Sequence, residues 1–172
     1  MKKTNEFITY GFFINPTQFR QITPNNKKYW RNKPDGGVWA SPVNSRAGWR
    51  EWCIRENWNV ESLSVYTKWK LADQSKILII DSERDVKEAY KKYNLEFKGL
   101  YLESERAYLD FWKMKNDGWD GVWLTENGLM EAGKYYGIMT HDGKYLDLYG
   151  WDVESIVVWN VDQIVITEKG RL

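Results

Sequence analysis

The segment from Gly36 to Trp49 reads GGVWASPVNSRAGW and combines a strand pattern with a helix pattern. Its apolar part, Val38 to Ser41, follows a glycine pair and is closed by Pro42, which predicts a short strand. Ser45 then predicts a helix cap. Apolar side chains follow it at helical spacing and predict a short amphipathic helix that contains Trp49, Trp52, Cys53 and Glu56.

Strand patterns dominate the chain on both sides of this segment. Further strands are predicted over residues 7–13, 63–71, 76–80, 121–125, 155–159 and 163–167, with a hairpin over 136–148 that turns on Asp142-Gly143. Helices are predicted from the Ser82 cap, with Asp85 at the capping-box position, to about Tyr93, and over 104–115. Because strands outnumber helices without alternating regularly with them, we expect an α+β fold. Its core is expected to be a mostly antiparallel, split β-sheet with a few short helices.

The composition narrows the classes of function. The chain has 172 residues, which suits one domain over 1–172, and its 25 Lys and Arg nearly balance its 24 Asp and Glu. There is therefore no strong nucleic-acid signal. No apolar run approaches the roughly 20 residues that cross a bilayer, and no signal-like stretch opens the chain, so we expect no membrane association and a cytoplasmic location.

The sequence contains few residues that could support metal binding or thiol chemistry. His141 is the only histidine and stands beside the predicted Asp142-Gly143 turn, so no metal site is predicted. Cys53 is the only cysteine and is expected to be a small buried hydrophobe rather than a nucleophile. The eleven Trp and eleven Tyr are expected to be mostly core, although aromatic faces also hold flat ligands.

Residues 36–49 resemble a motif of the ADP-ribosyltransferase superfamily, which includes poly- and mono-ADP-ribosyltransferases. In that motif a strand of glycine-x-tyrosine-phenylalanine-alanine leads into serine-lysine-serine-alanine-x-tyrosine at a helix start. The two aromatic residues of the family sandwich the nicotinamide ring of NAD, and the resemblance assigns these places to Trp39 and Trp49. For Ser41 it leaves two roles open, a bond to the nicotinamide amide or a cap on the turn at Pro42.

A second match lies near the end of the chain, where residues 153–164 read VESIVVWNVDQI. They resemble the family's asparagine-glutamate-tyrosine-isoleucine-valine-tyrosine strand, whose glutamate is catalytic, and this role falls on Glu154. In the family it hydrogen-bonds a hydroxyl of the nicotinamide ribose and stabilises the cation-like sugar as nicotinamide leaves. The alternative for Glu154 is a solvated carboxylate at a strand entrance.

The family's first motif, a histidine or arginine followed by glycine, corresponds to Tyr10-Gly11. Gly11 fits the glycine whose backbone approaches the nicotinamide amide. Tyr10 replaces the basic residue, and its hydroxyl would bond an adenosine ribose or the amide. The basic segment from Lys27 to Lys33 is either solvated surface or a contact for the diphosphate of NAD or a nucleic-acid backbone.

The resemblance implies a domain that binds NAD as substrate and transfers a single ADP-ribose to an unknown acceptor, protein, nucleic acid or water, with release of nicotinamide. This would be a mono-ADP-ribosyltransferase or NAD glycohydrolase, of the kind found among toxins and phage effectors. The alternative is an inactive module on the same fold that binds a protein or a nucleotide. The two hypotheses differ in whether Glu154 lines one cleft together with Gly11, Trp39 and Trp49.

Overall fold

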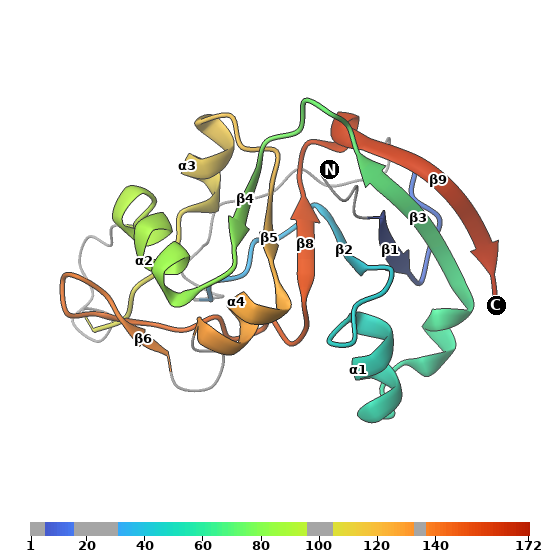
Figure 1. Ribbon diagram of the computed structural model, residues 1–172, viewed down its shortest axis with the longest axis horizontal. Coiled ribbons are helices and arrows are strands. Elements are labelled where there is room, and N and C mark those ends of the chain that lie inside the picture. Colours follow the sequence, from blue (N-terminus) through green and yellow to red (C-terminus); the bar gives the residue numbers. More distant parts are fainter. Residues whose placement is uncertain (1–5, 16–30, 96–104, 133–136) are drawn as a thin grey trace.

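A computed structural model describes residues 6–15, 31–95, 105–132 and 137–172. Seven strands form one sheet in the order β4-β5-β8-β2-β1-β3-β9 (Figure 1). In that order they are Ile77–Ile80, Gly121–Leu124, Ser155–Val158, Val38–Pro42, Glu6–Tyr10, Val65–Leu71 and Ile164–Arg171. The helices are α1 (Trp49–Arg55), α2 (Glu83–Lys92), α3 (Phe111–Asn116) and α4 (Glu126–Glu131).

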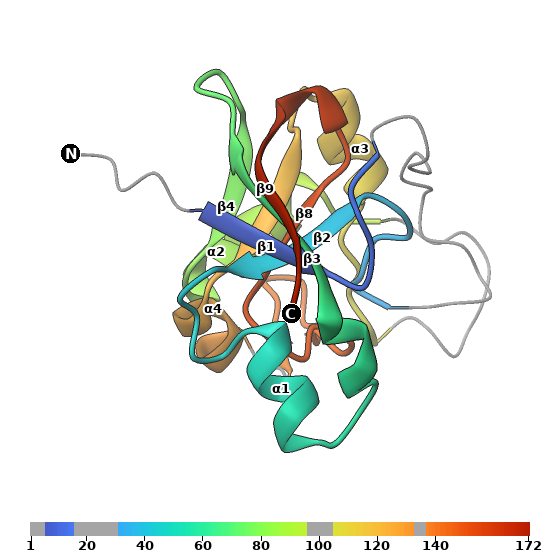
Figure 2. The same ribbon diagram turned by 90° about the vertical axis from the view of Figure 1, so that its right-hand side faces the viewer.

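The sheet is antiparallel at every described pairing except that of β4 with β5. Its two halves meet where β1 pairs with β2, with Phe7 opposite Pro42 and Ile8 opposite Ser41. Figure 2 shows the strong twist that carries β1 across the direction of β9. The α+β class with a mostly antiparallel sheet and a few short helices is therefore confirmed.

The central strand β8 separates two hydrophobic clusters, because successive side chains of a strand point to opposite faces. Val157 belongs to the cluster that contains the buried residues of α2 and α3. Ile156 and Val158 belong to the cluster around Phe7 and Trp69. All four residues of β8 are buried, so this strand is covered on both faces.

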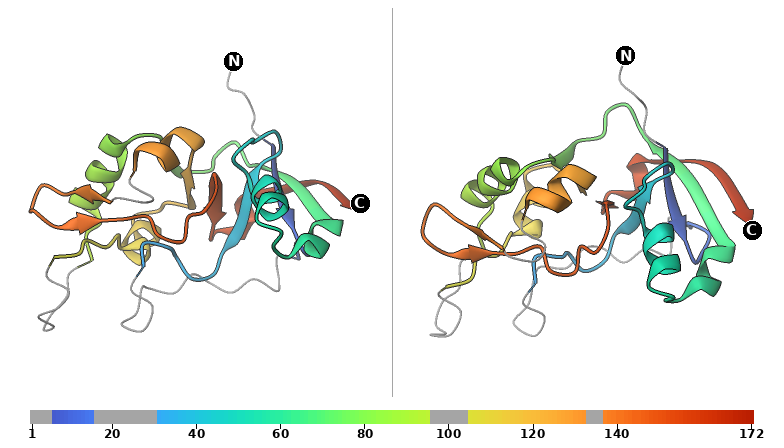
Figure 3. Two further views of the ribbon diagram at one scale, coloured as in Figure 1. Left: turned by 90° about the horizontal axis from the view of Figure 1, so that it is seen from below. Right: turned by 60° about the horizontal axis from the view of Figure 1, so that its bottom comes forward.

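The helices gather at the two ends of the sheet rather than alternating with its strands. Helices α2, α3 and α4 lie at the β4 end, and α1 lies at the other end below β2 and β3 (Figures 1 and 3). Helix α2 begins as predicted, because the Ser82 hydroxyl accepts a hydrogen bond from the Asp85 amide at 3.3 Å. Within the described residues no helix combines the length and apolar character that a membrane crossing requires.

The predicted helix over 104–115 is wrong in its first half. Helix α3 begins only at Phe111, where the Asp110 side chain accepts from the Lys113 amide at 2.8 Å. Before it, the Ala107 amide bonds the Tyr145 carbonyl at 2.7 Å, and the Tyr108 carbonyl accepts from Leu95. Pairing with distant segments has therefore replaced the local helical bonds over 105–110, while residue 104 lies outside the described residues.

Smaller differences from the predictions have local causes. Strand β1 ends at Tyr10 rather than at residue 13, because Gly11 adopts a φ of 95°. A 3-10 turn at Val60–Ser64 delays the start of β3. The Ser45 cap is wrong, since Gly48 is the N-cap of α1 and the Trp49 amide donates to the hydroxyl of Ser41. Helix α4, which was not predicted, is capped by Thr125.

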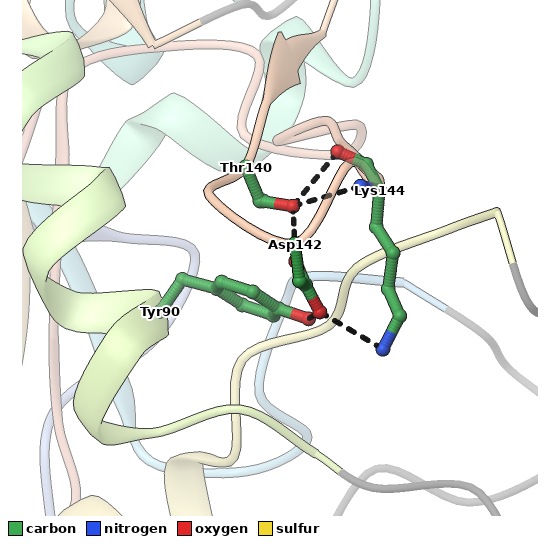
Figure 4. Close-up of polar contacts among 4 residues, drawn as sticks. All are labelled: Tyr90, Thr140, Asp142 and Lys144. Atoms are coloured by element: carbon green, nitrogen blue, oxygen red, sulfur yellow. Dashed lines mark hydrogen bonds and ion pairs between the residues drawn. The ribbon is translucent and has the colours of Figure 1, made fainter.

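The predicted hairpin is present as β6 (Ile138–Met139) and β7 (Tyr145–Leu146), and Gly143 in its turn has a φ of 77°. Residue 136 lies outside the described residues. In Figure 4 the Asp142 carboxylate accepts from Thr140 at 2.6 Å and from Tyr90 of α2 at 3.1 Å, and Lys144 pairs with it at 3.1 Å. These contacts fasten the hairpin turn to α2.

Candidate functional site

A pocket of about 560 Å³ lies where β1, β2 and the start of β8 meet α1. Its walls come from segments far apart in the sequence. The described lining residues are Ile8, Thr9, Tyr10, Gly11, Phe12, Lys33, Gly37, Trp39, Ala40, Ser41, Trp49, Asn59, Ser62, Gly150, Asp152, Val153 and Ser155. The volume is within the range of small-molecule sites.

The pocket brings together all five residues that the sequence assigned to NAD binding, namely Tyr10, Gly11, Trp39, Ser41 and Trp49. The register explains the first part of this arrangement. Since Ile8 lies opposite Ser41 in antiparallel strands, Tyr10 and Trp39 come to the same face two residues farther along. Trp49 joins them because α1 begins soon after β2 ends.

Two other indoles pack against the Trp49 ring. It stacks on Trp52 with ring centroids 5.1 Å apart and an interplanar angle of 16°. Trp58 meets it edge-on at 5.4 Å and 79°. One face of Trp49 is therefore backed by protein while the ring lines the pocket, which is a fixed platform for a flat ligand.

The Trp39 ring is more crowded than that of Trp49. Trp151 packs against it at 4.8 Å with an angle of 63°, and the Lys33 ammonium lies 4.8 Å from its centroid. Part of the Trp39 surface is thus already in contact with a cation. A ligand ring has its more open stacking partner in Trp49.

The Ser41 hydroxyl ties three elements together at the floor of the pocket. It donates to the Glu154 carbonyl at 2.9 Å and accepts from the Trp49 amide at 2.9 Å. Its single donor is therefore used within the protein. The sequence left a cap on the turn at Pro42 as one of two roles for Ser41, but the hydroxyl instead accepts from the first amide of α1. Ser41 also lines the pocket, where the other role, a bond to the nicotinamide amide, would require it.

Tyr10 and Gly11 line the pocket at the end of β1. Burial raises the pKa of the Tyr10 hydroxyl, partly offset by the positive charge of Arg50. The Gly11 amide donates to the Val65 carbonyl at 2.9 Å, so this amide is already hydrogen-bonded within the protein. The positive φ of Gly11 turns the chain sharply as β1 ends.

Glu154 stands apart from the other predicted site residues. Its neighbours Asp152, Val153 and Ser155 line the pocket, but Glu154 itself is not among the lining residues. Its amide donates to the Ala47 carbonyl at 2.9 Å, and the residue is only 8% exposed. Glu154 therefore lies behind its lining neighbours Val153 and Ser155, and its carboxyl is directed away from the pocket.

The surroundings of the Glu154 carboxyl lie on the other face of the sheet. Burial raises its pKa, and contacts with the side chains of Ser45 and Trp123 partly oppose this shift. Trp123 sits opposite Ile156, so strand alternation puts Glu154 on their face and Ser155 on the pocket face. The Trp123 Nε1 is buried near this carboxyl without completing a hydrogen bond to any described residue.

The pocket also contains two charged residues, of which the sequence left Lys33 open as either solvated surface or a diphosphate contact and did not assign Asp152 to ligand binding. Lys33 and Asp152 are the only lining residues with a formal charge among those described. The basic segment 27–33 was a signal for Lys33, and residues 27–30 of that segment lie outside the described part of the chain. For Asp152 the sequence offered only one indication of a role in the site, its position two residues before Glu154.

Comparison of the chain with protein-family models, with curated proteins and with solved structures finds no match. Across the described residues, no three His, Cys, Asp or Glu side chains gather in a way that would hold a metal ion. Cys53 is free and buried on α1, as expected from its position on the aromatic side of that helix.

Proposed function

We propose that the pocket binds NAD, with the nicotinamide ring stacked on Trp49 and Trp39 forming the facing wall. The observation that carries this proposal is that Tyr10, Gly11, Trp39, Ser41 and Trp49 line a single pocket although they come from three separate segments. The resemblance to ADP-ribosyltransferases assigns these same residues to NAD binding. A flat ring on a fixed indole is stabilised by stacking, which contributes about 1–3 kcal/mol per ring.

Of the two functions left open by the sequence, binding without turnover is favoured by the position of Glu154. A carboxylate that stabilises a cation-like ribose must face that sugar. The Glu154 carboxyl instead contacts Ser45 and Trp123, outside the lining of the pocket. We therefore propose a nucleotide-binding module as the primary function.

Transfer of ADP-ribose is the second candidate, and one observation favours it. Glu154 itself does not line the pocket, but both of its chain neighbours, Val153 and Ser155, do. A change in the backbone of this short segment would turn the carboxyl toward the ligand. In that case Glu154 would stabilise the departing sugar, and nicotinamide would be released.

Calorimetric titration with NAD tests the binding proposal. We expect saturable binding to the natural chain and affinity lowered about fivefold to a hundredfold in Trp49→Ala, since one stacking partner is removed. The matched control is Trp112→Ala, which removes an exposed indole of α3 outside the pocket. Absence of saturation at millimolar NAD, or equal affinity loss in both variants, would contradict the proposal.

An assay of nicotinamide release in the same samples separates the two candidates. Saturable binding without release is the result expected for a binding module. Release that is lost in Glu154→Gln while NAD still binds would instead establish the transferase or glycohydrolase.

A further inference from the structure

The Lys33 ammonium is built into the pocket wall rather than extended into solvent. Its Nζ donates to the Gly150 carbonyl at 2.8 Å and lies over the Trp39 ring. Both of these partners also line the pocket. The charge is thus presented next to the aromatic surface that a ligand ring would share.

The backbone that carries Lys33 is fixed by its neighbour Asn32, which is only 2% exposed. The Asn32 amide group donates to the carbonyls of Ala107 at 3.0 Å and Asp147 at 2.7 Å, and its oxygen accepts from the Leu109 amide at 2.7 Å. The Trp151 indole in turn donates to the Asn32 backbone carbonyl. The root of the Lys33 side chain is therefore anchored by four hydrogen bonds.

The stem of Lys33 passes close to Gly150. A Cβ at position 150 would lie 3.3 Å from the Lys33 Cδ, and Gly150 has a φ of 93°. The glycine therefore leaves room for the stem as well as accepting the hydrogen bond from its head. The backbone beside Lys33, its aliphatic chain and its ammonium group are therefore each held in place, as in a preorganised binding residue.

The electrostatic surroundings of Lys33 suit an anionic ligand group. Burial lowers the pKa of the Lys33 amine, and the charge of Asp152 opposes this shift. The acceptor of its hydrogen bond is a neutral carbonyl. A charge-assisted bond to an anion is shorter and about twice as strong as a neutral one, so an entering anion would gain a strong partner.

We propose that Lys33 binds the phosphate of the ligand, so that the pocket selects a nucleotide over the corresponding nucleoside. This inference rests on the proposed binding of NAD and names the group of the ligand that determines affinity. The ring stacks on Trp49, and its phosphate lies at the Gly150 end of the pocket, beside Trp39. Asp152 limits the gain from any second negative charge at that end.

The test compares two ligands that differ by one phosphate, nicotinamide mononucleotide and nicotinamide riboside, by calorimetry on the full chain. The natural chain is expected to bind the mononucleotide about tenfold more tightly, as for one charge-assisted hydrogen bond. Lys33→Met keeps the aliphatic part of the side chain and is expected to lose this preference while it still binds the riboside. Lys33→Arg keeps the charge and is expected to retain part of the preference.

Equal binding of the two ligands by the natural chain, or a full preference in Lys33→Met, would overturn the assignment of Lys33 and leave the binding proposal intact. Binding of neither ligand would overturn both. Sodium phosphate alone is a third titrant and is expected to bind at least a hundredfold more weakly than the mononucleotide. If it bound as tightly, the site would be one for free phosphate and not for a nucleotide.

A measurement on the natural chain keeps the test independent of how Lys33→Met folds. Raising NaCl from 50 to 500 mM screens the phosphate contact. The affinity for the mononucleotide is expected to fall several-fold, and by more than that for the riboside, which carries the pyridinium charge but no phosphate. The same salt dependence for both ligands would count against a phosphate contact.

Discussion

Asn32 shows how much one side chain contributes to the shape of the pocket. Its amide group satisfies two backbone carbonyls and one backbone amide on segments that lie 75 to 115 residues farther along the chain. No local pattern in the sequence indicates this role, because the three partners are brought to Asn32 only by the fold. A buried polar group without these partners would leave several backbone groups unsatisfied at once.

Asn32→Ala is expected to lower the free energy of unfolding by about 3 kcal/mol, because buried backbone groups of Ala107, Leu109 and Asp147 lose their partner. Urea unfolding followed by circular dichroism measures the change. The control is Asn44→Ala at an exposed position, which is expected to change stability by less than about 0.5 kcal/mol. A loss below 1 kcal/mol in Asn32→Ala would show that the anchor is dispensable.

Glu154 carries a prediction about pH. Because burial raises its pKa, the folded protein holds this proton at a pH where the unfolded chain has released it. The stability of the natural chain should therefore fall as the pH rises from about 4.3, the unfolded value, through the folded pKa. In Glu154→Gln this decrease should be absent.

Unfolding curves recorded between pH 4 and 8 test this prediction. Glu61→Gln, at an exposed position, serves as the control and should follow the natural chain. Parallel curves for the natural chain and Glu154→Gln would mean that the carboxyl is exposed to water, which would also bring it closer to the role that the transferase requires.

At the scale of elements, the hairpin β6–β7 depends on the polar cluster that joins it to α2. Burial alone would raise the pKa of Asp142, but hydrogen bonds from Thr140, Lys144 and Tyr90 outweigh this effect and lower it to about 2. The stability from this carboxylate is therefore present above its unfolded pKa of about 4 and is lost as the pH falls toward 2. Figure 4 shows the four side chains concerned.

Asp142→Asn is expected to cost about 1 kcal/mol at pH 7, a modest value because the ion pair with Lys144 is partly exposed. It should also remove part of the acid-dependent loss between pH 4 and 2. In hydrogen-exchange measurements, Asp142→Asn should accelerate amide exchange in the hairpin more than in β5 or β8. Asp73→Asn, at an exposed position, is the control, and an equal effect of both substitutions would assign the change to net charge.

The element boundaries show which local sequence signals were sufficient to predict a helix, strand or turn. The Ser82 cap, the Asp142-Gly143 turn and the strand at Val38 depend on residues within a few positions of each other, and each was predicted. The stretch 105–110 has helical spacing but forms backbone bonds to Leu95 and Tyr145. Its structure depends on pairing that the local sequence does not encode.

At the scale of the whole molecule, the sheet requires close approach between β5 and β8. A Cβ at Gly121 would lie 2.3 Å from the Val157 carbonyl oxygen and 3.1 Å from the Val158 Cα. Both are backbone atoms of a central strand that is buried on its two faces. The sheet can accommodate a methyl group there only if β5 and β8 move apart.

Gly121→Ala is therefore expected to cost about 3 kcal/mol or more, seen as a loss of folded protein or a large drop in the unfolding midpoint. Gly118→Ala is the matched control. A Cβ there meets nothing within 4 Å, and only its φ of 85° penalises alanine, by about 1 kcal/mol. Similar losses in the two variants would show that strand packing at Gly121 tolerates a methyl group.

The sequence by itself determined the α+β class, most strands and five residues that share the pocket, because these follow from short-range patterns and from a motif in continuous segments. Only the tertiary structure decided the partners of Ser41, the entry of Lys33 into the pocket and the direction of the Glu154 carboxyl. The bonds of Ser41 to Glu154 and of Lys33 to Gly150 span 113 and 117 positions. Contacts of that range depend on how the strands assemble, and a shift of one residue in β8 would exchange the faces of Glu154 and Ser155.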